Sequence, residues 1–587
     1  MQTCLSRFFV ILLMAVSAWG SQASIAPQPV QPGEELLITE NEIGQYGGRV
    51  VTALRSEPKT LNPAIATDGP SREVIGRITA DLIHINRASQ QTEPALAKSW
   101  KASPDGLRYT LRLRKGLRFS DGHSCDADDV VFSFQVYLDE KTHSTQRDLL
   151  IVGGKPIALH KIDPLTLVFE LSQPYAAAER LFDSFAILPR HILEKTYQEG
   201  RLAQVWGVSS PATEVVGLGP FRLKEYVPGQ QMVLERNPYY WKADRKGERL
   251  PYLDELVFLF VPSDDAQVIR FQAGDTDVLS RMSAENYSVL EQEQQKRGFR
   301  LYDLGPGLEY SFLFFNLNTS LPKDSTIARK QSWFKDVRFR QAVSNAIDRE
   351  GIVRLVYRGH AAPLWADVTP AYKLWVNPAI PHPPRSLEKS RELLKAAGFS
   401  WKSDGTLVDS GGDPVEFSIV TSASNAQRTQ IATIIQDDLK QVGMRVQVVP
   451  LEFRAVLDRV FQTHDFEASV LALGSADPDP NTKMNVLVSS GASHLWDLGE
   501  SQPATPWEAE IDRLMKQQVS TLKFAERNRL YGRVQQLMYE NLPLICIVSP
   551  NILVGAKTTV GNFRPAILDH YTLWNVDQLF VRSPGKH

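Results

Sequence analysis

The sequence predicts a mixed α/β protein built from more than one domain. Its 587 residues exceed what a single hydrophobic core usually supports, so two or three domains are expected. Short segments of alternating apolar and polar residues, separated by turn residues, predict β-hairpins. One stretch in the C-terminal third combines a strand, a helix and a second strand, which is the order of a βαβ unit.

The first element in chain order is a predicted signal peptide at residues 1–23. Arg7 precedes an apolar run at 8–18, and Ser21 and Ala23 supply small residues at the alternate positions that signal peptidase requires. The run is too short to span a bilayer comfortably. A lipoprotein signal would place a Cys just after the run, whereas Cys4 lies before it. We therefore expect export to a periplasm-like compartment without a lipid anchor; the alternative is an N-terminal anchor that is never cleaved.

Residues 24–45 lack any periodicity and are rich in Pro, so they predict a leader strand or an extended arm that runs over the surface. A strand is expected at 49–54. Alternating apolar residues then predict three hairpin regions, which are 109–119 around Lys115-Gly116, the region beginning at 165–171, and 221–234 around Pro228-Gly229. Between the first two, Asp126 or Asp128 is placed to cap a helix that continues through Phe134.

The βαβ unit is the clearest pattern in the chain. Val415, Phe417 and Ile419 alternate along its first strand, and Val446 and Val448 begin its second. Its helix has one apolar face, formed by Ile431, Ile434, Ile435, Leu439 and Val442, and Gly443 is placed to cap its end. The loop after the first strand then lies at the carboxyl edge of a parallel sheet, where ligands commonly bind. The pocket candidates there are Thr421, Ser422, Ser424 and Asn425, and ordinary capping and turn chemistry is the alternative for each.

Composition limits the possible partners. Lys and Arg total 65 against 67 Asp and Glu, so no net field attracts nucleic acid or anionic lipid. Hydrophobic residues at 43% and charged residues at 22% are typical of an ordered globular protein. Beyond the signal peptide only Cys125 and Cys546 remain. An oxidising compartment would permit a disulfide between them without requiring it, and we expect free buried thiols.

Several motifs, spread over nearly the whole mature chain, carry a family resemblance. They include EPKTLNP at 57–63, GLGPF at 217–221, RNPYYW at 236–241 and FKDVRFRQAV at 334–343. Each has a structural explanation, since Gly219-Pro220 is a turn and Asp336 caps a helix. Taken together and in this order, they resemble the family 5 extracellular solute-binding proteins of ABC transporters. That family includes oligopeptide-, dipeptide-, nickel- and glutathione-binding proteins.

The resemblance implies a two-lobed periplasmic binding protein fold (type II, cluster C-like) with an inserted subdomain and a two-segment hinge. It implies lobe I at 46–85, 210–305 and 548–587, the inserted subdomain at 86–209, and lobe II at 306–547. It further implies a monomeric periplasmic protein that captures a peptide or peptide-like solute and delivers it to an ABC permease. No cofactor, nucleic-acid partner or catalytic activity is expected.

The resemblance also implies a ligand-binding segment at 471–480. The family's peptide binders commonly hold the ligand's α-ammonium with an Asp in this segment, because a charge-assisted hydrogen bond is strong in a closed cleft. The position where oligopeptide and dipeptide members place that Asp is Ala476 here. Asp477 serves the same role if the loop is one residue shorter. The alternative is that Asp477 and Asp479 cap turns before Pro478 and Pro480.

Three more binding candidates rest on position alone. Arg428, at the start of the βαβ helix, has the guanidinium fork that suits a ligand carboxylate. The alternative is that Arg428 contacts a surface residue one helical turn away. His494 and Trp496 follow the Asp segment and are candidates for an aromatic cleft wall. A Trp in the hydrophobic core is the alternative for this pair.

Two other function classes remain as alternatives. A secreted peptidase is one, but the chain contains no HExxH zinc pair, no GxSxG nucleophile turn and no glycine-rich phosphate loop. A metal-chelate binder is the other. The 11 His residues include no i,i+4 pair, so direct coordination of a bare ion is not expected. A chelate held through its organic part stays open.

Overall fold

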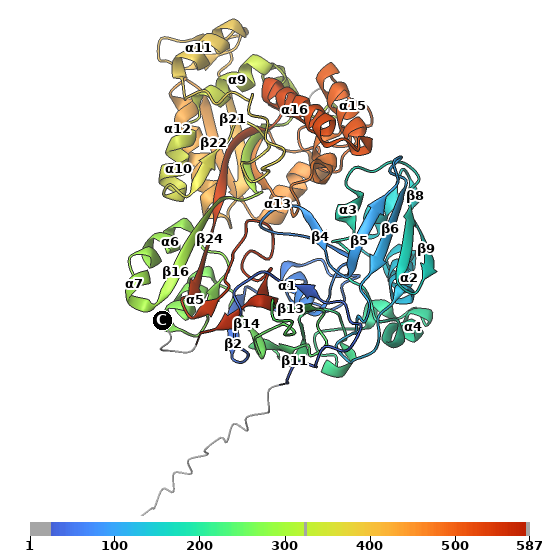
Figure 1. The fold of residues 1–587 in the computed structure, drawn as a ribbon. Coiled ribbons are helices and arrows are strands. Elements are labelled where there is room, and N and C mark those ends of the chain that lie inside the picture. Colours follow the sequence, from blue (N-terminus) through green and yellow to red (C-terminus); the bar gives the residue numbers. More distant parts are fainter. Residues whose placement is uncertain (1–24, 322–325, 583–587) are drawn as a thin grey trace, which may run out of the picture.

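Two lobes joined by two chain crossings make up the structure (Figure 1). The computed structural model describes residues 25–321 and 326–582, so the predicted signal peptide at 1–23 lies outside the described residues. Among these residues, no helix combines the length and the apolar character that a membrane span requires.

A single long strand belongs to both lobes. β24 (Ile545–Lys557) pairs near its start with β17 (Tyr310–Phe315) in lobe II and near its end with β16 (Phe299–Pro306) in lobe I. The two crossings are therefore the short link between β16 and β17 and the middle of β24. The amide of Gly307 donates to the carbonyl of Pro550 at 3.0 Å and ties these crossings together. This arrangement confirms the predicted two-segment hinge.

The βαβ unit lies in the sheet of lobe II. β21 (Glu416–Ser422) and β22 (Arg445–Leu451) pair in parallel, α12 (Ala426–Lys440) connects them, and β23 (Ala468–Leu473) lies on the other side of β21. The predicted apolar helix face is confirmed, since Ile431, Ile435, Leu439 and Val442 are fully buried and Ile434 packs at the edge. Gly443 follows the helix with φ +89, a left-handed conformation that glycine adopts without strain.

The remaining helices of lobe II enclose this sheet. They are α8 (Thr326–Phe334), α9 (Val337–Ala346), α10 (Arg349–Tyr357), α11 (Leu387–Ala396), α13 (Phe453–Asp458), α14 (Met484–Leu487), α15 (Pro506–Ser520) and α16 (Phe524–Asn541). Asp336 caps α9 as predicted, because its side chain accepts from the amide of Arg338. Phe315 stacks on Phe334 with ring centroids 4.7 Å apart, at the centre of an aromatic core.

Lobe I contains a four-stranded sheet in the order β11-β12-β14-β2. Its strands are β2 (Arg49–Leu54), β11 (Phe221–Val227), β12 (Gln231–Arg236) and β14 (Glu255–Phe260). The predicted hairpin around Pro228-Gly229 is confirmed by antiparallel pairing of β11 and β12. In the N-terminal arm, β1 (Leu37–Ile38) pairs with β13 (Lys242–Ala243), so the arm lies along lobe I.

Lobe I also contributes α1 (Gly69–Ile78), α5 (Asp264–Ala273), α6 (Ala284–Glu291), α7 (Gln294–Arg297) and β15 (Val278–Leu279). The hairpin of β3 (Ile83–Ile85) and β4 (Thr92–Pro94) extends from this lobe toward lobe II (Figure 1). The predicted domain boundary between residues 85 and 86 therefore falls inside a hairpin. The boundaries as a set remain predictions.

A third sheet, in the order β5-β6-β10-β9, lies beside lobe I. It is formed by β5 (Ala97–Ala102), β6 (Arg108–Leu113), β9 (Ala158–Asp163) and β10 (Thr166–Glu170), and is accompanied by α2 (Ala127–Leu138), α3 (Ala178–Leu181) and α4 (Arg190–Gln198). Asp126 is the N-cap of α2, as predicted. The predicted hairpin over 109–119 is wrong, because β6 pairs with β5 and β10 instead. Alternation revealed the strand at 108–113 but not which segments pair with it.

Both described cysteines are free and buried, as expected. Cys125 belongs to the core shared by lobe I and the third sheet, and Cys546 to the core of lobe II. Burial raises the pKa of both thiols, so neither is a ready thiolate.

Candidate functional site

A cavity of about 290 Å³ lies between the lobes, beside the hinge. Three groups of residues line it. Lobe I contributes Arg281, Ile567, Asp569 and Tyr571, the two crossings contribute Leu308, Glu309, Pro550 and Ile552, and lobe II contributes Gly474, Ser475 and Ala476. Because its walls come from both lobes and from the hinge, any movement of one lobe relative to the other alters its shape.

The direction of the strands explains why lobe II presents the segment 474–476 here. β23 ends at Leu473 and runs parallel to its neighbour β21, which ends at Ser422. Both strands therefore finish at the same edge of the sheet, where open α/β sheets commonly receive their ligands. Gly474 and Ala476 are exposed to the cavity.

The cavity contains charges of both signs. The guanidinium of Arg281 lies 3.2 Å from a carboxylate oxygen of Glu309. Although burial opposes it, the pKa of Arg281 is raised, because Tyr571, Glu309 and Asp569 favour the cation. Burial, reinforced by Asp569 and Glu309, raises the pKa of Tyr571 to about 12, so its hydroxyl stays protonated. One cation and two carboxylates suit a ligand that carries both an ammonium and a carboxylate.

Asp477 connects lobe II to the part of the molecule that carries the third sheet, and it does not line the cavity. Its carboxylate accepts from Arg180 Nε at 2.7 and 3.0 Å, and Arg180 lies on α3 beside the third sheet. Arg180 also donates to the carbonyl of Gln90 at 3.0 Å. Burial raises the pKa of Asp477, with Arg180 acting against that shift. Contact of Asp477 with a ligand stays a prediction, whereas Ala476, at the position that the resemblance assigns to the anchor, does line the cavity.

Further contacts join the lobes near this ion pair. Gln90 Nε2 donates to the carbonyl of Ala371 at 2.8 Å, and the amide of Ala176 donates to the carbonyl of Val519 at 2.8 Å. The structure therefore has its lobes in contact on the side of the third sheet, away from the hinge.

Asp479 does not line the cavity. It is buried, and both of its carboxylate oxygens accept from Arg527 at 2.6 and 2.7 Å. It also accepts from the amide of Asn481 at the start of a 3₁₀ turn at Pro480–Lys483. The alternative stated for Asp479, a turn cap, describes its contact with Asn481, and the ion pair with Arg527 fixes its carboxylate.

The residues of the loop between β21 and α12 are occupied by local hydrogen bonds. Thr421 donates to the carbonyl of Val470, Ser422 is buried and bonded to Ser424, and Asn425 caps α12 by accepting from the amide of Arg428. None of these residues lines the cavity. Capping and turn chemistry thus accounts for their contacts.

Arg428 differs from its neighbours, because its guanidinium has no ion pair within the described part of the chain. The pKa of Tyr357 in α10 rises to about 12, because burial and the charge of Glu309 disfavour its ionised form. Ser311 and the positive charge of Arg428 oppose this rise. Arg428 does not line the cavity.

His494 and Trp496 lie in the core of lobe II. Both side chains are fully buried, their ring centroids are 3.9 Å apart, and Trp496 Nε1 donates to Glu508 of α15 at 2.9 Å. A cleft wall needs a surface that a ligand can reach, and these rings have none. The core alternative describes them correctly, because the loop that carries them folds back under α15.

The charged and aromatic cavity residues Arg281, Glu309, Asp569 and Tyr571 were missed by the sequence reasoning. They lie far apart in the chain and outside lobe II, where the candidates were sought. No local motif marks them, so only the folded chain reveals that they meet.

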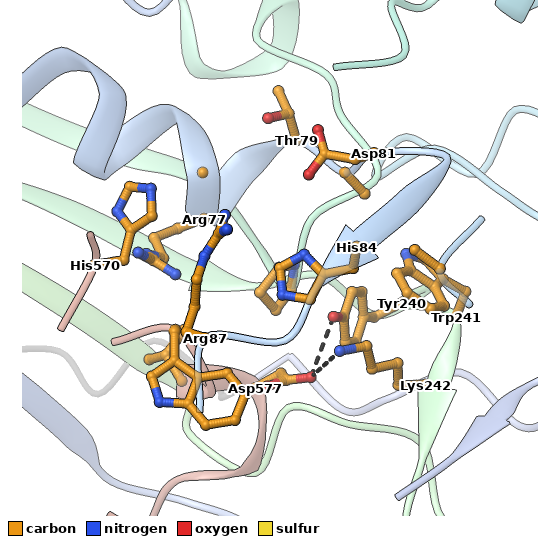
Figure 2. Close-up of a pocket in the computed structure, with 16 residues that line it drawn as sticks. Arg77, Thr79, Asp81, His84, Arg87, Tyr240, Trp241, Lys242, His570 and Asp577 are labelled. Atoms are coloured by element: carbon orange, nitrogen blue, oxygen red, sulfur yellow. Dashed lines mark hydrogen bonds and ion pairs between the residues drawn. The ribbon is translucent and has the colours of Figure 1, made fainter. Parts of the chain in front are cut away.

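A second cavity of about 100 Å³ lies within lobe I (Figure 2). Its labelled lining includes Arg77, Asp81, His84, Arg87, Lys242 and His570. Figure 2 shows Tyr240 and Lys242 converging on Asp577, at 3.2 and 3.0 Å. His570 lines this cavity and its neighbours Asp569 and Tyr571 line the first, so one loop separates the two.

Glu73 of α1 stabilises the wall of this second cavity. It accepts from Arg77 at 2.9 Å and pairs with His570 Nδ1 at 2.5 Å. Although burial acts in the opposite direction, His570 and Arg77 lower its pKa to about 2. A depressed carboxyl pKa contributes stability that is fully present above the ordinary value of 4.5 and lost as the pH falls toward 2.

Glu73→Gln is therefore expected to lower the free energy of unfolding at pH 7 by about 2–3 kcal/mol. The difference from the wild type should shrink between pH 4.5 and pH 2, which urea denaturation at several pH values measures. Glu388→Gln on exposed α11 is the control and should change little. If Glu73→Gln lowered the free energy of unfolding by the same amount at pH 7 and pH 3, the link between stability and the Glu73 pKa would be contradicted.

Comparisons with known proteins agree with this architecture. The model of the bacterial extracellular solute-binding proteins, family 5 (middle region), matches residues 91–494. A probable ABC transporter-binding protein of Deinococcus radiodurans is 27% identical over 92% of this chain and 93% of its own. The oligopeptide-binding protein AppA of Bacillus subtilis is 26% identical over 94% of each chain.

Solved structures share the fold. AppA of Bacillus subtilis in complex with a nonapeptide aligns with a TM-score of 0.68 at 24% identity, over 92% of this chain and 100% of that one. CtaP of Listeria monocytogenes aligns with a TM-score of 0.74 at 22% identity and the same coverage. These matches confirm the predicted two-lobed fold. The chain therefore belongs to the family 5 extracellular solute-binding proteins, which are substrate-binding proteins of ABC transporters and not enzymes.

Proposed function

We propose that this protein is exported to the periplasm, where it captures a peptide or peptide-like solute as a monomer and delivers it to the permease of an ABC importer. The cavity between the lobes is the observation that carries the proposal. A ligand that contacts both lobes stabilises the closed form by its differential affinity, and the permease can then recognise that form. The relative in Bacillus subtilis is named as an oligopeptide-binding protein.

The charges of the cavity suggest how a peptide is oriented. Asp477 is already paired with Arg180 and Glu309 with Arg281, so the ligand's ammonium is directed first to Asp569. Arg281 then receives a carboxylate or carbonyl group. The exposed backbone at 474–476 offers main-chain hydrogen bonds of the kind that bind peptides with little dependence on side chains.

The size of the cavity favours a short ligand. Its volume of about 290 Å³ is at the lower end of the range of about 300–1,000 Å³ that is typical of small-molecule sites. A short peptide-like solute therefore fits the present arrangement of the lobes better than a long one.

Mass spectrometry of small molecules released from the denatured native protein tests the proposal directly. We expect peptides or peptide-like solutes, and thermal stabilisation of the emptied protein by the same compounds. N-acetylation of the ligand should weaken this stabilisation, because it removes the ammonium. Protein that arrives empty and is stabilised by no peptide would overturn the assignment, as would cleavage of an added peptide. A metal chelate in the released material would favour the chelate-binding alternative.

Ala476→Trp is expected to abolish ligand binding while leaving the fold intact. Ala476 is exposed to the cavity, so an indole at this position fills space that the ligand needs. We expect affinity for the released ligand to fall at least tenfold, as measured by calorimetry. The matched control is Ala158→Trp, on the exposed face of edge strand β9. Unchanged affinity in Ala476→Trp would place the ligand outside this cavity.

A further inference from the structure

A buried cluster of His494, Glu500 and Glu508 lies in lobe II and has no part in the ligand cavity. One imidazole nitrogen and one oxygen of each carboxylate lie within 4.8 Å of one another, and all three residues are buried. His494 and Glu500 come from the loop between α14 and α15, and Glu508 from the first turn of α15. The cluster therefore joins a long loop to a helix.

Three polar atoms of this cluster have no hydrogen-bond partner. They are Nε2 of His494 and both carboxylate oxygens of Glu500. The His494 ring is fully buried, and the side chain of Glu500 is only 4% exposed. Buried polar groups are nearly always satisfied, because leaving one without a partner is costly. Three such atoms that face one another indicate a missing partner common to all of them.

The spacing of these atoms suits a metal ion. His494 Nε2 lies 3.5 Å from Glu500 Oε2 and 3.8 Å from Glu508 Oε1, both longer than an ordinary hydrogen bond. Zinc binds imidazole nitrogen and carboxylate oxygen at about 2.0–2.2 Å in tetrahedral geometry, which places ligand atoms about 3.4 Å apart. A small movement of the side chains would bring all three atoms to this spacing.

The surrounding hydrogen bonds orient the potential ligands. His494 Nδ1 lies 3.1 Å from the carbonyl of Val486, and because a carbonyl only accepts, Nδ1 carries the proton. With the proton on Nδ1, Nε2 is the ring nitrogen whose lone pair can face the cluster. On the other side, Trp496 donates to Glu508 Oε1 at 2.9 Å and Thr505 donates to Glu508 Oε2 at 2.7 Å. Metal-binding carboxylates and imidazoles are commonly held by such outer contacts.

The cluster also gathers carboxylates that repel one another. Glu500 and Glu508 lie close together with Asp497 nearby, and no Lys or Arg in the described part of the chain forms an ion pair with either glutamate. A divalent cation would neutralise both carboxylates at once. Both oxygens of Glu500 are unoccupied, so this residue can bind in a bidentate manner.

We propose that His494, Glu500 and Glu508 form a binding site for a divalent transition-metal ion, with zinc as the ion that the nitrogen and oxygen ligands and their spacing suit best. Glu500 binds through both oxygens, Glu508 through Oε1 and His494 through Nε2. The ion fastens the loop of residues 488–505 to α15. It is structural and lies apart from the cavity between the lobes, so the proposal does not depend on which solute the protein transports.

Equilibrium dialysis of tag-free protein, first treated with EDTA and then exposed to zinc chloride, tests the site. We expect about one zinc ion per chain, measured by elemental analysis, and a rise in melting temperature of about 2–5 °C at a hundredfold excess over Kd. Glu500→Gln should weaken zinc binding at least a hundredfold. Cobalt(II) should replace zinc and produce visible ligand-field absorption that this variant lacks.

A second cluster provides the matched control. Asp81, His84 and Asp183 also lie within metal-ligating distance of one another, so His84→Gln removes the other candidate site. Zinc binding should persist in His84→Gln and disappear in Glu500→Gln. The opposite result would overturn the proposal, as would wild-type protein that binds no zinc.

The stability of Glu500→Gln in EDTA separates a metal site from a buried ion pair with His494. Because the oxygens of Glu500 accept no hydrogen bond of ordinary geometry in the described part of the chain, its replacement should leave the metal-free melting temperature unchanged or raise it. A clear drop in the metal-free melting temperature would mean that His494 is the charged partner of Glu500, and would contradict the metal site.

Discussion

Arg527→Met is expected to lower the free energy of unfolding by about 3–5 kcal/mol, because it leaves a buried carboxylate without its partner. Arg527 of α16 holds both oxygens of Asp479, at 2.7 and 2.6 Å, and its Nε donates to Gln518 at 2.9 Å. The two charged side chains are only 6% and 7% exposed. Urea denaturation followed by circular dichroism measures the loss.

The exposed pair of Arg513 and Glu510 on α15 is the matched control. Its distance is a similar 2.8 Å, but the side chains are 58% and 37% exposed. Arg513→Met should therefore cost less than about 1 kcal/mol. The double variant Arg527→Met with Asp479→Leu should recover part of the stability, since no buried charge is left unpaired. Equal losses for Arg527→Met and Arg513→Met would contradict the role of burial.

The Arg527 variant also has an expected functional effect. Asp479 follows the segment 474–476 that lines the cavity by three residues, and the neighbouring Lys483 pairs with Asp367 at 2.8 Å. These two buried ion pairs position the segment. Ligand affinity should therefore fall in Arg527→Met even at temperatures where the protein remains folded.

Trp496→Ala is expected to destabilise the protein by a similar amount, about 3–5 kcal/mol, because it empties a large space in the core of lobe II. The ring is fully buried and donates a hydrogen bond to Glu508. Trp496→Phe retains most of the packing but removes the donor, so its cost should be lower, about 1–3 kcal/mol. Denaturant unfolding measures both variants.

Phe453→Ala is the control for this pair, since Phe453 is 41% exposed and its loss should cost little. The experiment also distinguishes the two interpretations of Trp496. A core residue affects stability first and ligand affinity only indirectly. If Trp496→Ala left stability intact and impaired only ligand binding, Trp496 would be a cleft residue after all.

Local patterns were the most reliable guide to structure. The face of α12, the cap of α2 by Asp126 and the hairpin predicted at 221–234 depend on residues close together in the chain, and all three are confirmed. The incorrect hairpin at 109–119 shows the limit. Its strand is real, but its partners are separated from it by loops of very different length, and alternation carries no information on pairing.

In the candidate site, too, the local features were predicted from the sequence and the long-range contacts were not. The cavity segment 474–476 follows β23 at the edge of the sheet where β21 ends, but none of the candidates at 421–425 lines the cavity. The sequence predicted a ligand site at that edge, because strand direction follows from the βαβ connection. It did not separate Asp477, which bridges to Arg180, from Asp479, which is buried on Arg527. Both partners are distant in the chain, so the two carboxylates look alike until the helices that carry the arginines are in place.

By itself, the sequence determined the α/β class, the family, the βαβ unit in lobe II and the edge of the sheet at which the cavity opens. Only the tertiary structure decided that Arg281, Glu309, Asp569 and Tyr571 meet Ala476 around one cavity, and that His494, Glu500 and Glu508 face one another in the core. The physical reason is that helix and strand formation depends on neighbours a few residues apart. A binding site, in contrast, depends on which distant segments the packing of two lobes brings together.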